Sequence, residues 1–295
     1  MHRSPTFLAL RAFEAAARAG GFTAAGQELN LTPSAISHQI RALETHFGRK
    51  LFTRRGIKVV LNADGARLAE ALTIGFNTIH HACKEFAAGA QQQQLAVHCA
   101  PSFASKWLGP RLPAFMRLHP EITLRLTSGA APVDLLRHEE LDLVISYGSA
   151  RRRPGLVVET FGPEDIIALC TPELAARVAP STPEINALLI VSSVNPVGWN
   201  DWFAVNELPR PDPIRGPAYD RGALAVSAAA QGLGISLESR CFAIDELESG
   251  VLVEWGGGRF RNITRDMHFL SYREAQKASP PIMAFRQWLK LGLGS

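Results

Sequence analysis

Residues 22–61 read FTAAGQELNLTPSAISHQIRALETHFGRKLFTRRGIKVVL. Their pattern predicts two short helices, a tight turn at Asn30-Leu31 and then a small β-hairpin. Thr23 is the expected N-cap of the first helix. Thr32 is the expected N-cap of the second, with Pro33 at the first helical position, where its missing N–H costs nothing. The order of helix, turn, helix and hairpin predicts a winged helix-turn-helix.

The second helix has two distinct faces. Ile36, Ile40, Leu43 and Phe47 recur at helical spacing and predict one buried stripe, and Gly48 is the expected left-handed residue that ends the helix. The opposite face is small, polar and basic. Such a face can approach the major groove and donate hydrogen bonds to base edges.

The hairpin carries basic residues around its expected turn, which suits a wing that contacts neighbouring phosphates. An ordinary solvated helix and hairpin in a protein-binding module would fit the same spacing. The residues that we assign to DNA binding are Thr23, Thr32, Pro33, Ser34, Ser37, His38, Gln39, Arg41, Arg54, Arg55 and Lys58.

The residues themselves add a family resemblance. The stretch resembles the N-terminal signature of the LysR-type transcriptional regulators. The matching residues are Phe22-Thr23-Ala24-Ala25, Leu29, Thr32-Pro33-Ser34-Ala35-Ile36-Ser37, Gln39-Ile40, Leu43-Glu44, Leu51-Phe52 and Arg54. Within that family, LRAFEAAAR at 10–18 and SFASKWL at 102–108 are similar to the branch of the glycine-cleavage and β-lactamase regulators.

The sequence departs from the family pattern at two positions. Gly26 stands where the family usually has alanine, which is expected to loosen the first helix of the motif by about 1 kcal/mol. Asn62 stands where a threonine usually caps the next helix, and asparagine caps equally well.

Composition narrows the class of protein. A chain of 295 residues has room for two or three domains, and no run of about 18 apolar residues predicts a membrane span. The first residues lack a secretory core, and the four cysteines show no Cys-x-x-Cys pattern, so we expect a reduced, cytoplasmic protein.

The positive charge is concentrated at one end of the chain. Residues 1–88 contain 11 Lys and Arg and 6 Asp and Glu, a net +5, whereas the remaining 20 basic and 21 acidic residues give −1. This distribution favours a DNA-binding module at the N-terminus.

A long helix is expected over residues 62–88, with apolar side chains at steps of three or four. We expect two chains to pair along this stripe, as the resemblance implies, and thereby to space two recognition helices. Packing of the stripe on its own domain is the alternative. His80 and His81 point in different directions on a helix, so no shared metal is expected there.

Residues 89–94 form a polar hinge, and strands and helices alternate after it. This alternation with apolar strands predicts a mainly parallel α/β sheet. We expect strands at 95–100, 120–126, 141–147, 165–170, 187–191, 235–237 and 266–272, and helices at 101–108, 112–116, 133–137, 172–178, 199–205, 222–231 and 281–291.

The predicted organisation is a DNA-binding domain at 1–61, a linker helix at 62–88, a hinge at 89–94 and a regulatory domain at 95–295. We expect the regulatory domain to have one lobe at about 95–162 and 266–295 and another at about 163–265. Two lobes joined by a returning strand resemble periplasmic solute-binding proteins. Ligands in such folds lie between the lobes, at the carboxyl ends of strands.

An effector site is expected in this cleft. Ser102 begins a helix, where its hydroxyl and the free N–H groups suit a carboxylate, and Asp220 would suit an ammonium. The resemblance implies that the effector site includes Ser102, Phe103, Ser128, Gly129, Tyr147, Tyr219, Asp220 and Tyr272. Loop residues satisfied by water are the alternative for each, and Arg151-Arg152-Arg153 is read as a solvated patch.

The resemblance also implies partners. They are double-stranded promoter DNA, a small effector with a carboxylate as one candidate, RNA polymerase as another candidate, and a second chain. Helices near 112–118 and 223–230 are candidates for a second self-association surface, which would permit a homotetramer as well as a homodimer. No catalytic motif, cofactor or metal site is expected. A solute-binding module without a DNA role and a cleft-closing enzyme are the rival functions.

Overall fold

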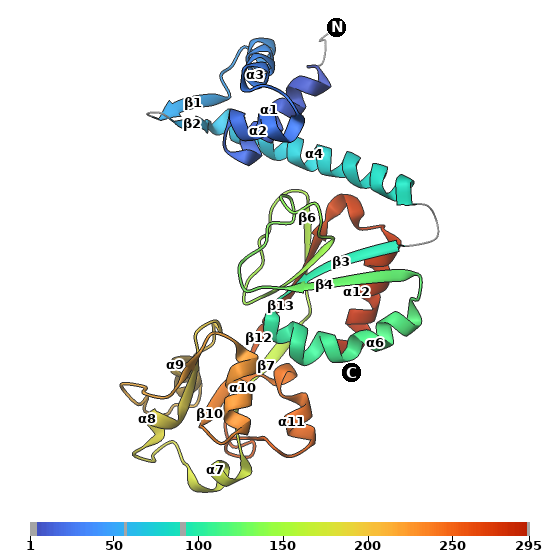
Figure 1. Cartoon of the computed structure of the whole chain (residues 1–295). Helices are drawn as coiled ribbons and strands as arrows, with labels where there is room; N and C mark the ends of the chain where they lie inside the picture. The colour runs from blue at the N-terminus through green and yellow to red at the C-terminus, as the bar shows by residue number, and fades with distance from the viewer. Residues whose placement is uncertain (1–4, 56–57, 89–92, 294–295) are drawn as a thin grey trace. The chain divides into compact units, whose positions relative to one another are not determined.

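The computed structural model describes residues 5–55, 58–88 and 93–293. The side chains of Arg54, Arg55, Lys58, His81 and residues 84–88 lie outside this description. The chain divides into two compact units, which are residues 1–89 with 136–139, and residues 90–135 with 140–295 (Figure 1).

The first unit is a three-helix core with a hairpin and a long helix. Its elements are α1 Phe7–Ala19, α2 Phe22–Leu29, α3 Pro33–Phe47, β1 Phe52–Arg55, β2 Lys58–Leu61 and α4 Ala63–Ala88. Phe13, Ile36 and Leu43 are almost fully buried in its core. The strands pair antiparallel, with Phe52 opposite Leu61. The predicted order of elements is confirmed.

Local capping explains most of the helix ends. The Thr32 hydroxyl accepts a hydrogen bond from the Ala35 N–H at 3.2 Å, and the Asn62 side chain accepts one from the Gly65 N–H at 2.8 Å. Gly48 has a φ of 64°, as predicted for the end of α3. Asn30, in the predicted turn, is also left-handed, with a φ of 53°.

Three predictions for this unit are wrong. Thr23 is not an N-cap, because α2 begins at Phe22 and Gly21 precedes it. Phe47 is 41% exposed, because the buried stripe of α3 ends at Leu43 and Glu44. Gly26 was expected to be about 1 kcal/mol less favourable for the helix than alanine. Alanine does not fit there without a shift, because its Cβ would lie 2.6 Å from the Leu31 carbonyl oxygen.

Glu44 joins the end of α3 to the hairpin. Its carboxylate accepts hydrogen bonds from the Leu51 N–H at 2.9 Å and from the Lys50 ammonium at 2.8 Å. Burial raises the pKa of Glu44, but the bonds from Lys50, Leu51 and Phe52 outweigh it, so that the pKa falls below its ordinary value of 4.5. The recognition helix and the wing are therefore coupled by an ionised side chain.

Replacing Glu44 with glutamine is expected to lower the free energy of unfolding of the first unit by about 1.5–3 kcal/mol, the typical worth of a hydrogen bond to a charged group. A depressed carboxyl pKa stabilises the fold above pH 4.5, and this contribution is lost as the pH falls through that value toward the lower folded pKa. Urea unfolding between pH 4 and 7 should therefore show a smaller acid loss in Glu44→Gln than in the parent chain. An unchanged acid loss would contradict the assignment.

The second unit contains two sheets. The first has the order β4-β3-β5-β13-β6, and the second has the order β11-β7-β10-β8-β9 with β12 also on β7. The strands are β3 Gln93–Cys99, β4 Ile122–Ser128, β5 Leu143–Tyr147, β6 Leu156–Thr160, β7 Pro163–Cys170, β8 Leu189–Ser192, β9 Ala218–Tyr219, β10 Ile235–Ser239, β11 Val253–Glu254, β12 Ile263–Asp266 and β13 His268–Arg273.

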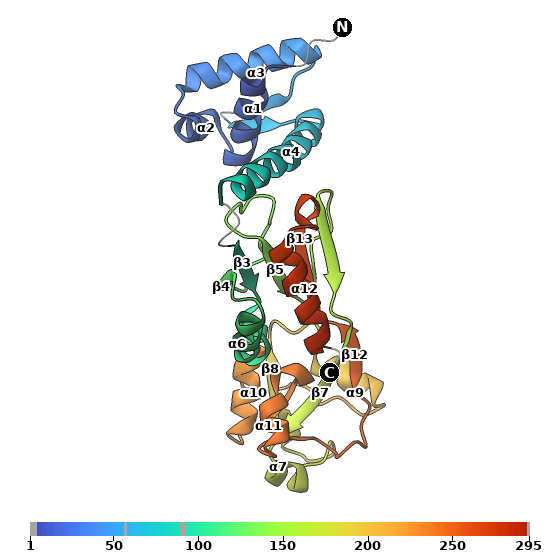
Figure 2. The ribbon, with the colours of Figure 1, turned by 90° about the vertical axis from the view of Figure 1, so that its right-hand side faces the viewer.

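Helices flank both sheets, and α12 runs along the first of them (Figure 2). They are α5 Pro101–Phe103, the π-helical turn η1 Ala104–Leu108, α6 Gly109–Leu118, α7 Pro172–Arg177, α8 Ile185–Leu188, α9 Trp199–Val205, α10 Gly222–Ala230, α11 Ile244–Glu248 and α12 Pro280–Leu293, with the 3₁₀ turns η2 Arg240–Phe242 and η3 Glu274–Gln276.

Several predictions for the second unit need correction. Both sheets are mixed rather than mainly parallel, because β13 pairs antiparallel with β5 and β6, and β7 pairs antiparallel with β10. The expected strand at 187–191 begins only at Leu189, after the helical turn α8. Strand β6 and helix α11 were not predicted.

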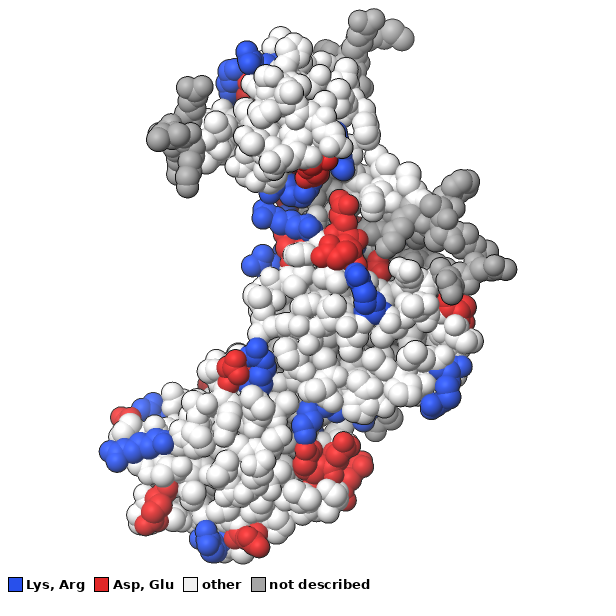
Figure 3. Space-filling view, viewed as in Figure 1, with Lys and Arg blue, Asp and Glu red and all other residues white. Residues whose placement is uncertain are grey.

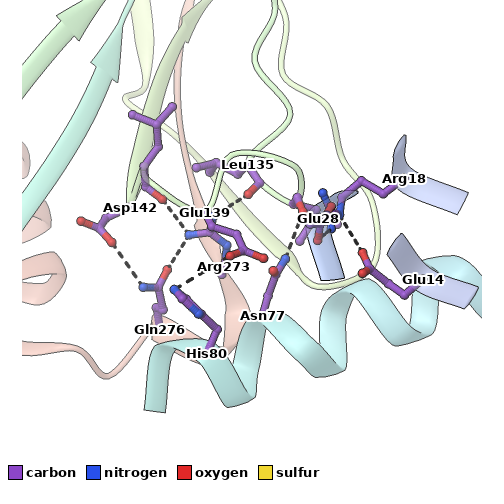
Figure 4. Close-up of polar contacts among 12 residues, drawn as sticks. Glu14, Arg18, Glu28, Asn77, His80, Leu135, Glu139, Asp142, Arg273 and Gln276 are labelled. Atoms are coloured by element: carbon purple, nitrogen blue, oxygen red, sulfur yellow. Dashed lines mark hydrogen bonds and ion pairs between the residues drawn. The ribbon is translucent and has the colours of Figure 1, made fainter. Parts of the chain in front are cut away.

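Residues 133–137 form a turn instead of the predicted helix. The buried Arg273 side chain forms hydrogen bonds with backbone carbonyl groups of this loop and of the residues that follow it. Its guanidinium donates to the Leu135 carbonyl at 2.5 Å, the Leu141 carbonyl at 2.7 Å and the Gln276 side chain at 3.1 Å (Figure 4). A contact from far along the chain thus replaces the local bonds of a helix.

The chain crosses between the two sheets at two places. It passes from β6 to β7 at 160–163 and returns from β12 to β13 at 266–268. The predicted return of the late strand to the first lobe is confirmed by its pairing with β5. Among the described residues, no helix is both long and apolar enough to cross a bilayer.

Candidate functional site

The outer face of α3 is open to solvent. Ser34, His38 and Arg41 are exposed, and Ser37 and Gln39 are half-buried. The Arg41 guanidinium donates to the Ser37 hydroxyl at 3.1 Å, so these side chains already lie together on one face. Small hydroxyls beside imidazole and guanidinium donors suit the edges and phosphates of a DNA groove.

The flanking DNA-binding candidates have separate positions. Thr32 and Pro33 are exposed at the start of α3, and Thr23 is exposed near the start of α2. In the hairpin, Arg55 pairs with Lys58 through the backbone, while the directions of the Arg54, Arg55 and Lys58 side chains lie outside the described part.

A cavity of about 510 Å³ lies in the second unit. Its walls come from both lobes, with His98, Ser102 and Tyr147 from the first and Asp220 and Gly222 from the second. Apolar side chains from the loop after Gly129 and from β5 make up much of the remainder. A largely apolar hollow with a few convergent polar groups is typical of a small-molecule site.

Ser102 is buried and links the two lobes. Its hydroxyl accepts a hydrogen bond from the Ala223 N–H, in the first turn of α10, at 3.1 Å. The helix dipole favours negative charge at this point. While it accepts this bond, the Ser102 hydroxyl can donate its own proton to a ligand carboxylate near the start of α10.

Two buried hydroxyls in the cavity wall have no hydrogen-bond partner among the described residues. They belong to Ser146 and Tyr147, which are neighbours on β5. Burial, with nearby Glu238 and Glu164, raises the pKa of Tyr147, so its phenol stays neutral and can donate. Unpaired buried hydroxyls are costly, and a bound ligand would satisfy them.

Charged groups also line this cavity. Arg221 donates to Asp220 at 2.7 Å, and Arg153 donates to Asp134 at 2.7 Å. Arg151 lies in the wall. Arg151 and Arg152 are exposed, as a solvated patch predicts, but Arg151 also lines the cavity and Arg153 is held by Asp134. On the face drawn in Figure 3, basic and acidic residues are interspersed over this unit.

Four of the predicted effector residues lie away from the cavity wall. Phe103 is fully buried and stacks on Trp107, and Tyr272 is buried with its hydroxyl donating to Glu159 at 2.6 Å. Ser128 is exposed at the end of β4, and Tyr219 lies on β9 outside the wall. The structure thus brings together only Ser102, Gly129, Tyr147 and Asp220 from that set.

Sequence reasoning also missed residues that belong to the site. His98 and Ser146 line the cavity on β3 and β5. Glu238 lies directly behind Gly222, where an added Cβ would meet its carboxylate at 2.7 Å. Burial raises the pKa of Glu238 to about 7, against hydrogen bonds from Ser192 and Asn195. In the sequence, the one feature that could have pointed to these three residues is that each is a polar residue within an apolar strand.

Two family models match this architecture. Residues 7–66 match the bacterial regulatory helix-turn-helix protein, lysR family, and residues 88–293 match the LysR substrate binding domain. The chain belongs to the LysR family of transcriptional regulators. It is a DNA-binding regulator with an effector-binding domain, and the resemblance seen in the sequence is confirmed.

Curated relatives extend over nearly the whole chain. The chain is 38% identical to the uncharacterized HTH-type transcriptional regulator y4mQ of Sinorhizobium fredii, over 98% of this chain and 96% of that one. It is 37% identical to the regulator PerR of Escherichia coli, over 97% and 95%. It is 32% identical to the glycine cleavage system transcriptional activator of E. coli, over 97% and 93%. These relatives are regulators.

Solved structures share the fold. The effector domain of AmpR from Pseudomonas aeruginosa is 26% identical, with a TM-score of 0.58 over 68% of this chain and 96% of that one. Full-length LysG from Corynebacterium glutamicum is 19% identical, with a TM-score of 0.67 over 99% of this chain and 98% of that one.

Proposed function

We propose that this LysR-type regulator reads promoter DNA with α3 and the β1–β2 wing, and that a small carboxylate-bearing effector in the cavity controls it. The domain boundaries we propose are 1–61 for DNA binding, 62–88 for the linker helix, 89–94 for the hinge and 95–295 for effector binding. A solute-binding role without DNA is not favoured, because family models match both the N-terminal and the C-terminal parts.

The observation that carries the effector proposal is the cavity with its unpaired hydroxyls. The start of α10, together with Arg151 and Arg221, supplies positive potential for a carboxylate. Asp220 supplies an acceptor for an ammonium group. The LysG structure is described with bound effector Arg, and an amino acid or short peptide is the class that we propose for this chain.

Self-association is proposed along α4. Leu68 and Leu72 pack partly on the core of the first unit, which accounts for the first half of the apolar stripe. Ile79 is 49% exposed, and Cys83 is also exposed. We propose that a second chain covers this second half and makes a homodimer.

A second contact would join dimers into a homotetramer. Met116 and Leu118 of α6 and Leu224 of α10 are large, exposed apolar side chains. We propose that pairing of these helices between chains forms this contact. RNA polymerase contact, a cytoplasmic location and the lack of catalytic activity are further parts of the proposal.

The proposed DNA binding can be tested directly. The purified chain should bind the duplex upstream of its own gene tightly and with a steep loss of affinity at higher salt, because phosphate contacts release counterions. A scrambled duplex of the same length is the control. Equal binding to both duplexes would contradict sequence-specific recognition at that promoter.

Replacing Ser102 with alanine is expected to weaken effector binding about tenfold, because one hydrogen bond of about 1–1.5 kcal/mol is lost. The effector would first be sought by thermal shift with L-amino acids and short peptides, and its affinity then measured by isothermal titration. Ser105→Ala is the matched control, because Ser105 is exposed and outside the cavity wall. Equal effector affinity in Ser102→Ala and the parent chain would show that the Ser102 hydroxyl does not bind the effector.

A further inference from the structure

A cluster of three potential metal ligands lies at the junction between the two lobes of the second unit. Glu164 stands at the start of β7, Cys241 in the turn η2 after β10, and His268 at the start of β13. One ligand atom from each side chain lies within 4.8 Å of the other two. His268 is fully buried, and Glu164 and Cys241 are partly covered.

The carboxylate of Glu164 is the centre of the cluster. One oxygen lies 2.7 Å from His268 Nδ1 and accepts the His268 backbone N–H at 3.1 Å. The other accepts the Ser239 hydroxyl at 2.6 Å and lies 3.5 Å from Cys241 Sγ. The donor groups of His268, Ser239 and Cys241 therefore all point toward one carboxylate, where a bound cation would lie.

Aromatic rings pack around the imidazole of the cluster. The Phe103 ring lies 4.3 Å from the imidazole of His268, and the Tyr147 ring lies 5.0 Å from it, centroid to centroid. Carboxylate and imidazole groups enclosed in this way require polar partners, which the hydrogen bonds within the cluster or a bound cation would supply.

We infer that Glu164, Cys241 and His268 bind one divalent transition-metal ion of the zinc class. Sulfur and nitrogen donors select Zn²⁺ or Co²⁺ over Mg²⁺ or Ca²⁺. Bonds of about 2.0–2.3 Å to O, N and S in a tetrahedron require ligand atoms roughly 3.3–3.6 Å apart. Cys241 Sγ already lies 3.5 Å from one Glu164 oxygen. His268 Nδ1 lies 2.7 Å from the other oxygen and must move about 0.6 Å away from it to reach that spacing.

The charges of the ligands balance those of the ion. Binding releases the Cys241 proton to solvent and requires the His268 proton to lie on Nε2, so that Nδ1 is free to bind. One thiolate and one carboxylate then neutralise the dication, with His268 as a neutral ligand. Ser239 Oγ, at 3.1 Å from Cys241 Sγ, or a water molecule would fill the fourth position.

The position of the cluster gives the ion a role in regulation. His268 belongs to the sheet of the first lobe, through β13. Glu164 belongs to the sheet of the second lobe, through β7, and Cys241 directly follows β10 of that sheet. An ion shared among them ties the lobes together beside both chain crossings. Its binding would restrict the opening of the effector cavity and so alter the affinity for the effector.

Cobalt spectroscopy on the full-length, tag-free, chelator-treated chain tests this inference. We expect one equivalent of Co²⁺ to bind, with a thiolate-to-cobalt charge-transfer band and intense visible bands of a tetrahedral site, and Zn²⁺ to displace it. Cys241→Ser should abolish the charge-transfer band, and His268→Gln or Glu164→Gln should weaken Co²⁺ binding at least tenfold. Cys83→Ser, which removes an exposed thiol, is the control and should bind as the parent chain does.

Two results would overturn the inference. One is the absence of a stoichiometric thiolate band in the parent chain, which would leave the cluster as a hydrogen-bonded hinge only. The other is a band that survives in Cys241→Ser, which would place the metal elsewhere. Should the variants fold poorly, the melting temperature of the parent chain decides, because it must rise with Zn²⁺ and fall back with chelator. None of these measurements depends on DNA or effector binding.

Discussion

Arg273→Leu is expected to lower the free energy of unfolding of the second unit by about 3–5 kcal/mol. Arg273 is only 2% exposed, and its guanidinium makes three hydrogen bonds to buried acceptors (Figure 4). Leucine fills part of the space but donates nothing, so the carbonyls of Leu135 and Leu141 lose a charged donor without gaining water. Urea unfolding followed by tryptophan fluorescence measures the loss.

The same substitution should also damage the effector cavity. Val133, Asp134 and Leu135 form part of its wall, and Arg273 holds this loop through the Leu135 carbonyl. Exposed Arg265→Leu, on β12, is the control and should change stability by less than about 0.5 kcal/mol. If Arg273→Leu were equally mild, the guanidinium would not be what stabilises the loop.

His38→Ala and Ser37→Ala are expected to change the preference for particular base pairs by about 1–3 kcal/mol for each recognition helix. The proposed homodimer places one recognition helix on each half of a two-fold-related site. The change in binding free energy would therefore occur in both halves, which makes it the largest expected effect on DNA binding. Competition binding with duplexes that carry single base-pair changes measures it. The structure supports the choice because both side chains lie on the open face of α3.

Substitutions in the β1–β2 hairpin are expected to act differently from those on α3. Arg54→Ala and Arg55→Ala should weaken binding to all duplexes and flatten the dependence of affinity on salt, since each removes about one phosphate contact. The base preference of these variants should stay that of the parent chain. A uniform loss from all four substitutions would contradict the division between base contacts and phosphate contacts.

Effector residues were harder to assign from sequence than DNA-contacting ones. The candidates on α3 follow from periodicity within a single helix, and Ser34, His38 and Arg41 are all exposed. The cavity takes residues from β3, β5 and the start of α10, which are far apart in the chain. Phe103 and Tyr272 were assigned to the site by the family resemblance, but their rings are buried in the hydrophobic core.

The sequence by itself determined the features that depend on neighbours three or four positions apart. These include the cap at Thr32, the left-handed end at Gly48, the long helix from Asn62 and the helix at 199–205. The family signature at 22–61 is of the same local kind. Such features need only short-range hydrogen bonds and one apolar face.

Only the tertiary structure decided the rest. The direction of β13, the capture of the 133–137 loop by Arg273 and the meeting of Glu164, Cys241 and His268 join segments separated by many tens of residues. Local propensity carries no information about these partners. Packing of both sheets in a shared core, and the need to pair buried polar groups, select them.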